Sequence, residues 1–481
     1  MFSFSTIKNY HTQLLQNEIS CLAAVQFYLQ KINSNKHLNA FTEIYTEDAL
    51  QKATELDAKR KSGEPLKKLH GVVIAIKDVI CYKGKKVTAA SKILAGFESI
   101  YTASALQFLI DEDAIIIGTC NCDEFAMGST NENSVYGKVL NAIDETKVPG
   151  GSSGGSAVAV QADMCMLSLG SDTGGSVRQP ADFCGIIGLK PSYGCISRYG
   201  LIAYASSFDQ IGIFGKQIED VALLLEIMSK PDEMDGTMLR EEQENFSTFK
   251  KDENTKYKIA YLKQALEHEG IDKEIAENII ALKNNLLNAG HEVSAIDFDL
   301  LDFIVPAYYV LTTAEASSNL GRYDGIRYGH VSEKKAENFN DYVLNNRTEG
   351  FGAEVKRRIM LGTFVLSTGY YDAYFAKAQK IRRLLVEKVT QIFATYDAII
   401  MPVSPCTAFD IGQKEKDPLA MYLADIFTVF ANLTALPAIA LPLFSHSNNM
   451  PFGVQVLCNK KHELLLLQIS EMLLTYKKAS V

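Results

Sequence analysis

Two short loops rich in glycine and serine carry the residues that are best suited to chemistry. The first spans residues 148–156 and leads into an apolar segment, and the second spans residues 170–180. Glycines let such a backbone approach a ligand closely, and its N–H groups can face an anion. A phosphate cradle and a flexible turn are alternatives for the first loop. The phosphate alternative is weakened because no Gly-Lys-Ser/Thr follows to supply the lysine and magnesium ligand of a P-loop.

Acyl transfer is the chemistry that the second loop suits best. It needs a hydroxyl nucleophile, a base and clustered backbone donors for the oxyanion, and Ser176 follows Thr173, Gly174 and Gly175. None of the 8 histidines lies within either loop, so a Ser-His-Asp triad is not indicated. Lys77 ends an apolar run, and burial that lowers its pKa would make it a base near neutral pH. Taken alone, Lys77 would be read as an ordinary solvated lysine in a turn.

The elements around these loops indicate an α/β fold with a large, mostly buried sheet. Continuous apolar runs at 71–76 and 114–118 are typical of strands buried on both faces, and 258–261 begins another strand. Helical spacing marks 218–228 and a long segment from 374 to 396. Alternating strands and helices of this kind predict helices packed on a central sheet.

The chain divides into four regions by composition. Residues 1–65 show helical spacing, 66–230 form the core with both loops, 231–256 are charged and poor in apolar residues, and 257–481 continue the same domain. We expect 231–256 to be an exposed connection between the two parts of the domain.

Composition excludes several classes of protein. The 481 residues are 47% hydrophobic and 22% charged, as in soluble globular proteins. The net charge of −9 has the wrong sign for a chain that grips nucleic acid on its own surface. The N-terminus does not resemble a secretory signal, and no apolar stretch is long enough to span a bilayer, so a cytoplasmic protein is expected.

The cysteines favour reduced thiols over a disulfide framework or a metal site. Their number, 9, is odd, and they are scattered along the chain. Cys120 and Cys122 are the one close pair, and no second Cys/His pair stands at zinc-finger spacing from them. No metal site is expected.

Lys77, Ser152 and Ser176 together resemble the Ser-Ser-Lys triad of the amidase signature family. They lie within Ala-Ile-Lys-Asp, Pro-Gly-Gly-Ser-Ser-Gly-Gly-Ser and Gly-Ser-Asp-Thr-Gly-Gly-Ser, and the spacings 152 − 77 = 75 and 176 − 152 = 24 match the family. The resemblance implies an amidase signature fold, with a large mixed central sheet covered by helices. It also implies a cis peptide before Ser152 and an oxyanion hole made by the backbone N–H groups of Thr173, Gly174, Gly175 and Ser176.

Longer segments are similar to one branch of that family, the glutaminase subunits of tRNA-dependent amidotransferases. These segments are 123–134, 198–201, 315–320 and 354–359. Phe430 departs from the pattern, because the family usually has proline there. The resemblance implies hydrolysis of glutamine to supply ammonia for transamidation of a mischarged tRNA. It further implies a heterotrimer with amidotransferase subunits B and C, a tRNA held mainly by a partner, no cofactor in this chain, and ATP and magnesium used by the complex.

The same resemblance places the amide-substrate pocket within 257–481 and implies which residues would bind glutamine. Arg358 would take the α-carboxylate, Asp425 the α-ammonium, and Tyr309 would line the pocket. Tyr308 competes with Tyr309 for that place, and Asp425 is also compatible with a surface or capping role.

Arg358 has a second interpretation, a pair with Glu354 on a solvated helix face, because Glu354 lies four residues before it. At about 100° per residue, however, Arg358 lies nearer than Arg357 to the face formed by 355, 359 and 362, which favours an inward position.

Two other functions remain as alternatives. A free-standing amidase would share the triad and lack a dedicated glutamine pocket. A nucleotide-binding module using residues 150–156 would bind phosphate and form no covalent serine adduct.

Overall fold

The structure is a computed structural model that describes residues 2–239, 245–249, 255–413 and 424–477. Of the expected connection 231–256, residues 240–244 and 250–254 lie outside the described residues. Within its described part, Phe246 is buried and the Asp235 carboxylate accepts a hydrogen bond from the Arg198 N–H.

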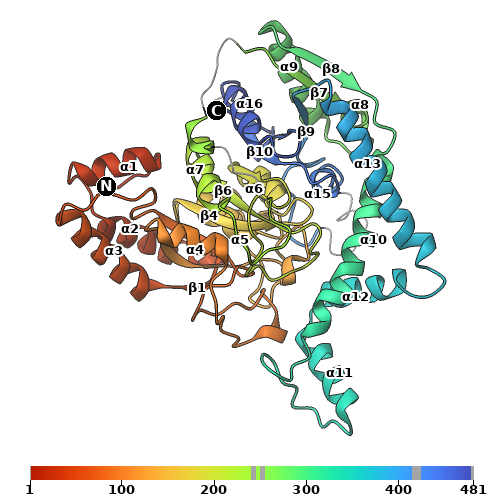
Figure 1. Cartoon of the computed structure of the whole chain (residues 1–481), viewed down its shortest axis with the longest axis horizontal. Helices are drawn as coiled ribbons and strands as arrows, with labels where there is room; N and C mark the ends of the chain where they lie inside the picture. Colours follow the sequence, from red (N-terminus) through yellow and green to blue (C-terminus); the bar gives the residue numbers. More distant parts are fainter. Residues whose placement is uncertain (1, 240–244, 250–254, 414–423, 478–481) are drawn as a thin grey trace.

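One mixed sheet of 11 strands runs through the molecule, and it confirms the predicted fold class (Figure 1). Strand β2 is parallel to β3 and β4, β7 is parallel to β8 and β9, and the other pairs are antiparallel. In spatial order the strands are β1 (Phe41–Ile44), β3 (Ile115–Cys120), β2 (Val73–Lys77), β4 (Leu167–Asp172), β6 (Gln210–Gly215), β5 (Ile187–Lys190), β10 (Ala438–Ser445), β11 (Pro451–Leu457), β9 (Ala398–Pro402), β7 (Lys258–Leu262) and β8 (Glu292–Ile296).

Helices surround this sheet. Figure 1 shows the N-terminal helices at one end of the molecule and α10, α12 and α13 along the opposite side. The helices are α1 (Ile7–Leu15), α2 (Cys21–Ser34), α3 (Thr46–Lys61), α4 (Ser104–Asp111), α5 (Gly154–Gln161), α6 (Arg178–Cys184), α7 (Ile218–Met228), α8 (Lys263–Glu267), α9 (Lys273–Asn288), α10 (Leu301–Asn319), α11 (Phe339–Gly350), α12 (Ala353–Val365), α13 (Lys377–Phe393), α15 (Val429–Leu433) and α16 (Glu463–Leu474).

The predicted strands and helices are largely confirmed. The two apolar runs became β2 and β3, which are buried at every residue, the strand predicted to begin at 258–261 is β7, and the predicted helix 218–228 is α7. The long predicted helix starts later, because a π-helical turn at Asp372–Ala376 precedes α13. The first 65 residues hold α1, α2 and α3, and also the edge strand β1, which helical spacing did not indicate.

The register of two central strands explains where the candidate site lies. Because β2 and β4 are parallel neighbours, with Ile76 paired to Leu169, their carboxyl ends meet at one edge of the sheet. Lys77 ends β2, and Asp172, which lies within the second glycine-serine segment, ends β4. In the part of the chain that the structure describes, no helix is both long and apolar enough to cross a membrane.

Candidate active site

Lys77 lies fully buried among serine hydroxyls. Its side chain has 0% exposure, and Nζ donates hydrogen bonds to Oγ of Ser152 at 2.7 Å, of Ser153 at 2.9 Å and of Ser171 at 3.0 Å. Burial lowers the pKa of the Lys77 ammonium group to about 8, although nearby acidic groups act in the opposite direction. The solvated-turn interpretation of Lys77 is therefore wrong, and a fraction of the amine is neutral near pH 7.

The first glycine-serine loop is bound by the protein's own acceptors. The Gly151–Ser152 peptide is cis, as the family resemblance implied. The Gly151 N–H donates to Gln179 Oε1 at 3.2 Å, and the Gly155 N–H is shared between Asn121 O and Asn131 Oδ1. Because these donors already have partners at the start of α5, the loop is poorly suited to cradle a phosphate.

Ser176 lies in the loop between β4 and α6, 7% exposed. Asp172 organises this loop, since its carboxylate accepts from the N–H of Gly175 at 2.9 Å and of Val177 at 3.2 Å. Burial is the largest single influence and opposes ionisation, but the charge and hydrogen bonds of Arg178, the charge of Lys190 and a hydrogen bond from Asn432 together outweigh it and lower the Asp172 pKa to about 2. With Gly175 N–H engaged, the backbone N–H groups of Thr173, Gly174 and Ser176 are the remaining candidates for the expected oxyanion hole.

The predicted relay runs from Ser176 through Ser152 to Lys77, and the structure shows the hydrogen bond between Lys77 and Ser152 but not the one between Ser152 and Ser176. Lys77 and Ser152 are hydrogen bonded, but Ser176 Oγ makes no hydrogen bond to any residue that the structure describes. Catalytic hydrogen bonds often tighten only when substrate is bound, so a structure without substrate need not show the second hydrogen bond of the relay.

Tyr309 and Asp425, two of the three expected glutamine-binding residues, are in direct contact. Tyr309 OH donates to Asp425 Oδ2 at 3.0 Å, and Ser129 Oγ donates to the same oxygen at 2.8 Å. Asp425 is 7% exposed, so the alternative of a surface aspartate is wrong.

Arg358 completes this cluster from α12. Its guanidinium lies 5.4 Å from the ring centroid of Tyr309, and Arg358 itself is 3% exposed. Nε donates to Glu354 Oε1 at 2.8 Å, and Nη1 donates to Tyr204 OH at 2.8 Å. The predicted inward position of Arg358 is confirmed; the pair with Glu354 also exists, but it is buried rather than solvated.

Two residues next to this cluster along the chain, Tyr308 and Thr428, contact Gly174 in the loop that carries Ser176. A methyl group added to Gly174 would lie 2.3 Å from Tyr308 OH, so the Tyr308 side chain lies directly against this glycine. Thr428, three residues after Asp425, donates its hydroxyl to Gly174 O at 2.7 Å. Tyr308 thus contacts the loop, while its neighbour Tyr309 contacts Asp425, and the cluster adjoins Ser176.

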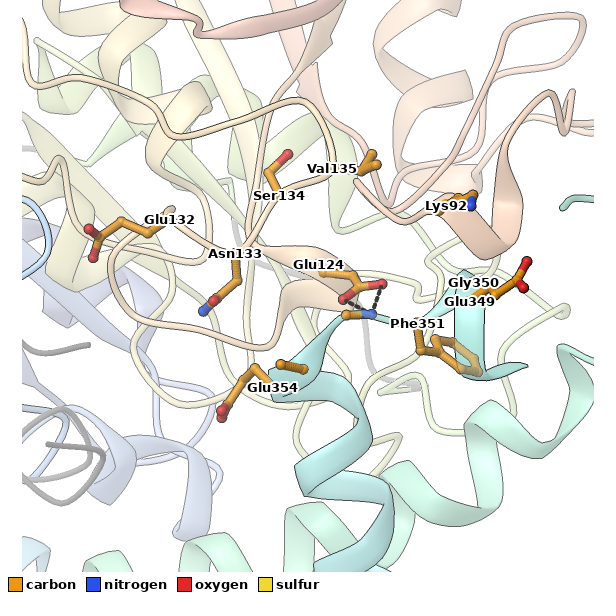
Figure 2. Close-up of a pocket in the computed structure, with 12 residues that line it drawn as sticks. Lys92, Glu124, Glu132, Asn133, Ser134, Val135, Glu349, Gly350, Phe351 and Glu354 are labelled. Carbon is orange, nitrogen blue, oxygen red and sulfur yellow. Dashed lines mark hydrogen bonds between the residues drawn. The ribbon is translucent and has the colours of Figure 1, made fainter. Parts of the chain in front are cut away.

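An acidic cavity of about 300 Å³ lies at the start of α12, with Glu354 among the residues that line it (Figure 2). Figure 2 shows Glu124, Glu132 and Glu354 around it, with the Glu124 carboxylate accepting two hydrogen bonds from Gly352 N–H. Through Glu354 this cavity adjoins Arg358. Among the described residues, no group of three or more His, Cys, Asp or Glu side chains is arranged to hold a metal ion.

Several residues of the site were not identified from the sequence. Ser153 and Ser171 lie in the two loops, and the density of serines was a signal that could have included them. Tyr204 and Ser129 lie far along the chain from Arg358 and Asp425, and no spacing in the sequence links them.

Comparisons with known proteins identify the family of this chain. The family model described as Amidase matches residues 23–467. The A subunit of the glutamyl-tRNA(Gln) amidotransferase of Chlorobaculum parvum is 48% identical over 97% of each chain, and that of Koribacter versatilis is 46% identical over 97% of each. The crystal structure of the Thermotoga maritima counterpart is 38% identical with a TM-score of 0.78, covering 97% of this chain and 93% of that one. The chain belongs to the amidase signature family.

Proposed function

We propose that this chain is the glutamine-hydrolysing subunit of a tRNA-dependent amidotransferase. The observation that carries the proposal is the contact of Tyr308 and Thr428 with Gly174, because it brings the Arg358, Tyr309 and Asp425 cluster beside the Ser176 loop. A free amino acid needs one cation and one anion for its α-groups, and the cluster supplies both. The full-length similarity to the glutamyl-tRNA(Gln) amidotransferase proteins supports the same substrate.

The reaction would proceed by a two-serine relay. Neutral Lys77 takes the proton of Ser152 as Ser152 takes that of Ser176, and Ser176 Oγ forms a bond to the amide carbon of glutamine. The carbonyl oxygen becomes negative and is stabilised by the backbone N–H groups of Thr173, Gly174 and Ser176. The proton returns through Ser152 to the amide nitrogen, ammonia leaves, and water hydrolyses the acyl-enzyme to glutamate.

The Lys77 pKa of about 8 fits this role, since roughly one amine in ten is neutral at pH 7 without any rearrangement. The adjacent hydroxyls of Ser153 and Ser171 hold the amine in place whether it is charged or neutral, because a hydroxyl donates as well as accepts.

Ammonia would pass to partner subunits B and C, which form a heterotrimer with this chain. The partner holds the mischarged tRNA and activates it with ATP and magnesium. The net charge of −9 supports this division of labour, because a negatively charged chain gains little from counterion release on binding tRNA.

The test measures two things, the glutaminase activity of the purified protein and the identity of the subunits that purify with it. The chain is purified from its native source, the accompanying subunits are identified by mass spectrometry, and release of ammonia from glutamine is measured. We expect two further subunits and glutaminase activity. A chain that purifies alone and prefers a simple amide over glutamine would be a free-standing amidase instead.

A further inference from the structure

Asp209 joins the nucleophile loop to the segment that begins at Tyr204. Its side chain is buried at 3% exposure, just before β6. Oδ1 accepts a hydrogen bond from Thr173 Oγ1 at 2.6 Å, and Oδ2 accepts from the N–H of Tyr204 and of Ala205, each at 3.0 Å. One carboxylate therefore holds a residue of the expected oxyanion hole and the backbone of Tyr204 at a fixed separation.

Tyr204 in turn holds Arg358. Its side chain is 1% exposed, its hydroxyl accepts from Arg358 Nη1 at 2.8 Å, and the guanidinium lies 5.4 Å from its ring centroid. The same hydroxyl donates to Thr312 Oγ1 at 3.0 Å, and Thr312 donates to Tyr308 O at 2.8 Å. Each hydroxyl in this series both accepts and donates, so the orientation of the Tyr204 hydroxyl is determined.

The segment between Tyr204 and Asp209 is also held from outside. Arg382 on α13 donates Nη1 to Ser207 Oγ and Nη2 to Ser207 O, both at 3.0 Å. Its guanidinium lies 4.3 Å from the ring centroid of Phe208. Movement of Tyr204 relative to Asp209 is therefore restricted.

We propose that Asp209 and Tyr204 are positioning residues that set the separation between the oxyanion donors and Arg358, and thereby favour amides that carry a carboxylate at that separation. The inference rests on the proposed function, since it takes Arg358 as the group that binds the glutamine α-carboxylate. Neither residue takes part in the bond-making steps. Tyr204 acts on Arg358 and hence on substrate binding, whereas Asp209 acts on both Thr173 and Tyr204.

The two residues have different expected kinetic signatures. Tyr204→Phe removes one hydrogen bond to a charged group, so we expect KM for glutamine to rise about tenfold with kcat nearly unchanged. Thr173→Val removes the other partner of Asp209 and should lower kcat about tenfold with KM nearly unchanged. Asp209→Asn replaces an acceptor with an amide that also donates, and should combine both effects.

The experiment compares glutamine with butanamide, which keeps the glutamine amide chain without its α-groups. Kinetics are measured with the full chain and its co-purifying subunits, and active sites are counted by fluorophosphonate labelling of the nucleophilic serine. Tyr193→Phe is the matched control, because Tyr193 OH donates to Ser206 O and the substitution likewise removes one tyrosine hydroxyl bonded to the same segment. We expect butanamide turnover to be unchanged in Tyr204→Phe and reduced in Asp209→Asn, and both substrates to be unaffected in Tyr193→Phe.

Equal losses for glutamine and butanamide in Tyr204→Phe would overturn the inference. So would normal kcat per labelled site in Asp209→Asn, because that result would mean a merely structural role. If Asp209→Asn does not fold, the contrast between Thr173→Val and Tyr204→Phe decides instead. If the wild type cleaves butanamide but not glutamine, the proposed function fails, whereas a butanamide loss in Asp209→Asn would still support its role toward Thr173.

Discussion

Lys77 ends strand β2, and Ser152 and Ser176 lie on loops beside it, whereas Arg358, Tyr309 and Asp425 come from helices α12 and α10 and from the segment before α15. The first group is fixed largely by backbone. The register of β2 and β4 brings Lys77 to the second loop, and Asp172 binds the N–H groups of that loop. The second group is fixed by side chains that meet across long stretches of sequence, as Tyr309 and Asp425 do.

This difference suggests a division between chemistry and specificity. We call Lys77, Ser152 and Ser176 the strand side. A change there alters groups that form bonds or transfer protons, so the turnover of every amide substrate should fall. We call Arg358, Tyr309 and Asp425 the helix side. A change there alters groups that only an amino acid substrate contacts, so the turnover of a neutral amide should be unchanged.

The largest effect is expected from Ser176→Ala. Loss of the nucleophile should lower turnover of both glutamine and butanamide by about four orders of magnitude or more. Ammonia release measures the activity, and thermal unfolding serves as the control because the variant removes one partly accessible hydroxyl. Near-normal turnover of either amide by Ser176→Ala would show that Ser176 is not the nucleophile.

Lys77→Ala should cost nearly as much for both substrates, as should Ser152→Ala, because the three residues act as one relay. In the wild type only the neutral amine accepts a proton, so kcat/KM should rise tenfold per pH unit below the Lys77 pKa of about 8 and level off above it. A pH profile of kcat/KM for butanamide tests this, since that substrate does not titrate in the range. A profile that falls with rising pH would require another base.

An intermediate and selective effect is expected from Arg358→Ala. Removing a charge-assisted contact to the α-carboxylate should lower kcat/KM for glutamine by about tenfold to a hundredfold and leave butanamide nearly unchanged. Arg358→Lys should rescue only partly, because an ammonium lacks the planar guanidinium fork. Arg357→Ala is the matched control, since that neighbouring side chain is 46% exposed. Equal losses of kcat/KM for glutamine and butanamide would show that Arg358 has a structural role, and the proposed difference between the strand side and the helix side would then be wrong.

The smallest effect concerns tRNA. The isolated chain should show no appreciable binding to tRNA at physiological salt, because a chain of net charge −9 gains little from counterion release. Filter retention measures this, with the complete complex as the positive control. Tight binding by the isolated chain would mean that it contributes a tRNA surface of its own.

The sequence by itself was enough to predict the residues of the strand side and the buried strands next to them. Lys77, Ser152 and Ser176 stand in local motifs, and the apolar runs before them predicted β2 and β3, because a strand buried on both faces needs apolar residues at successive positions. The inward position of Arg358 followed from helical spacing. Each of these features depends on residues that are close together along the chain.

The tertiary structure alone decided how the helix side is assembled. The contact of Tyr204 with Arg358 spans 154 residues, and that of Ser129 with Asp425 spans 296. The burial of the Glu354–Arg358 pair and the bond from Thr173 to Asp209 were decided in the same way. Local periodicity shows which face of an element is apolar, but it carries no information on which distant polar group meets that face, because that choice depends on how the elements pack together.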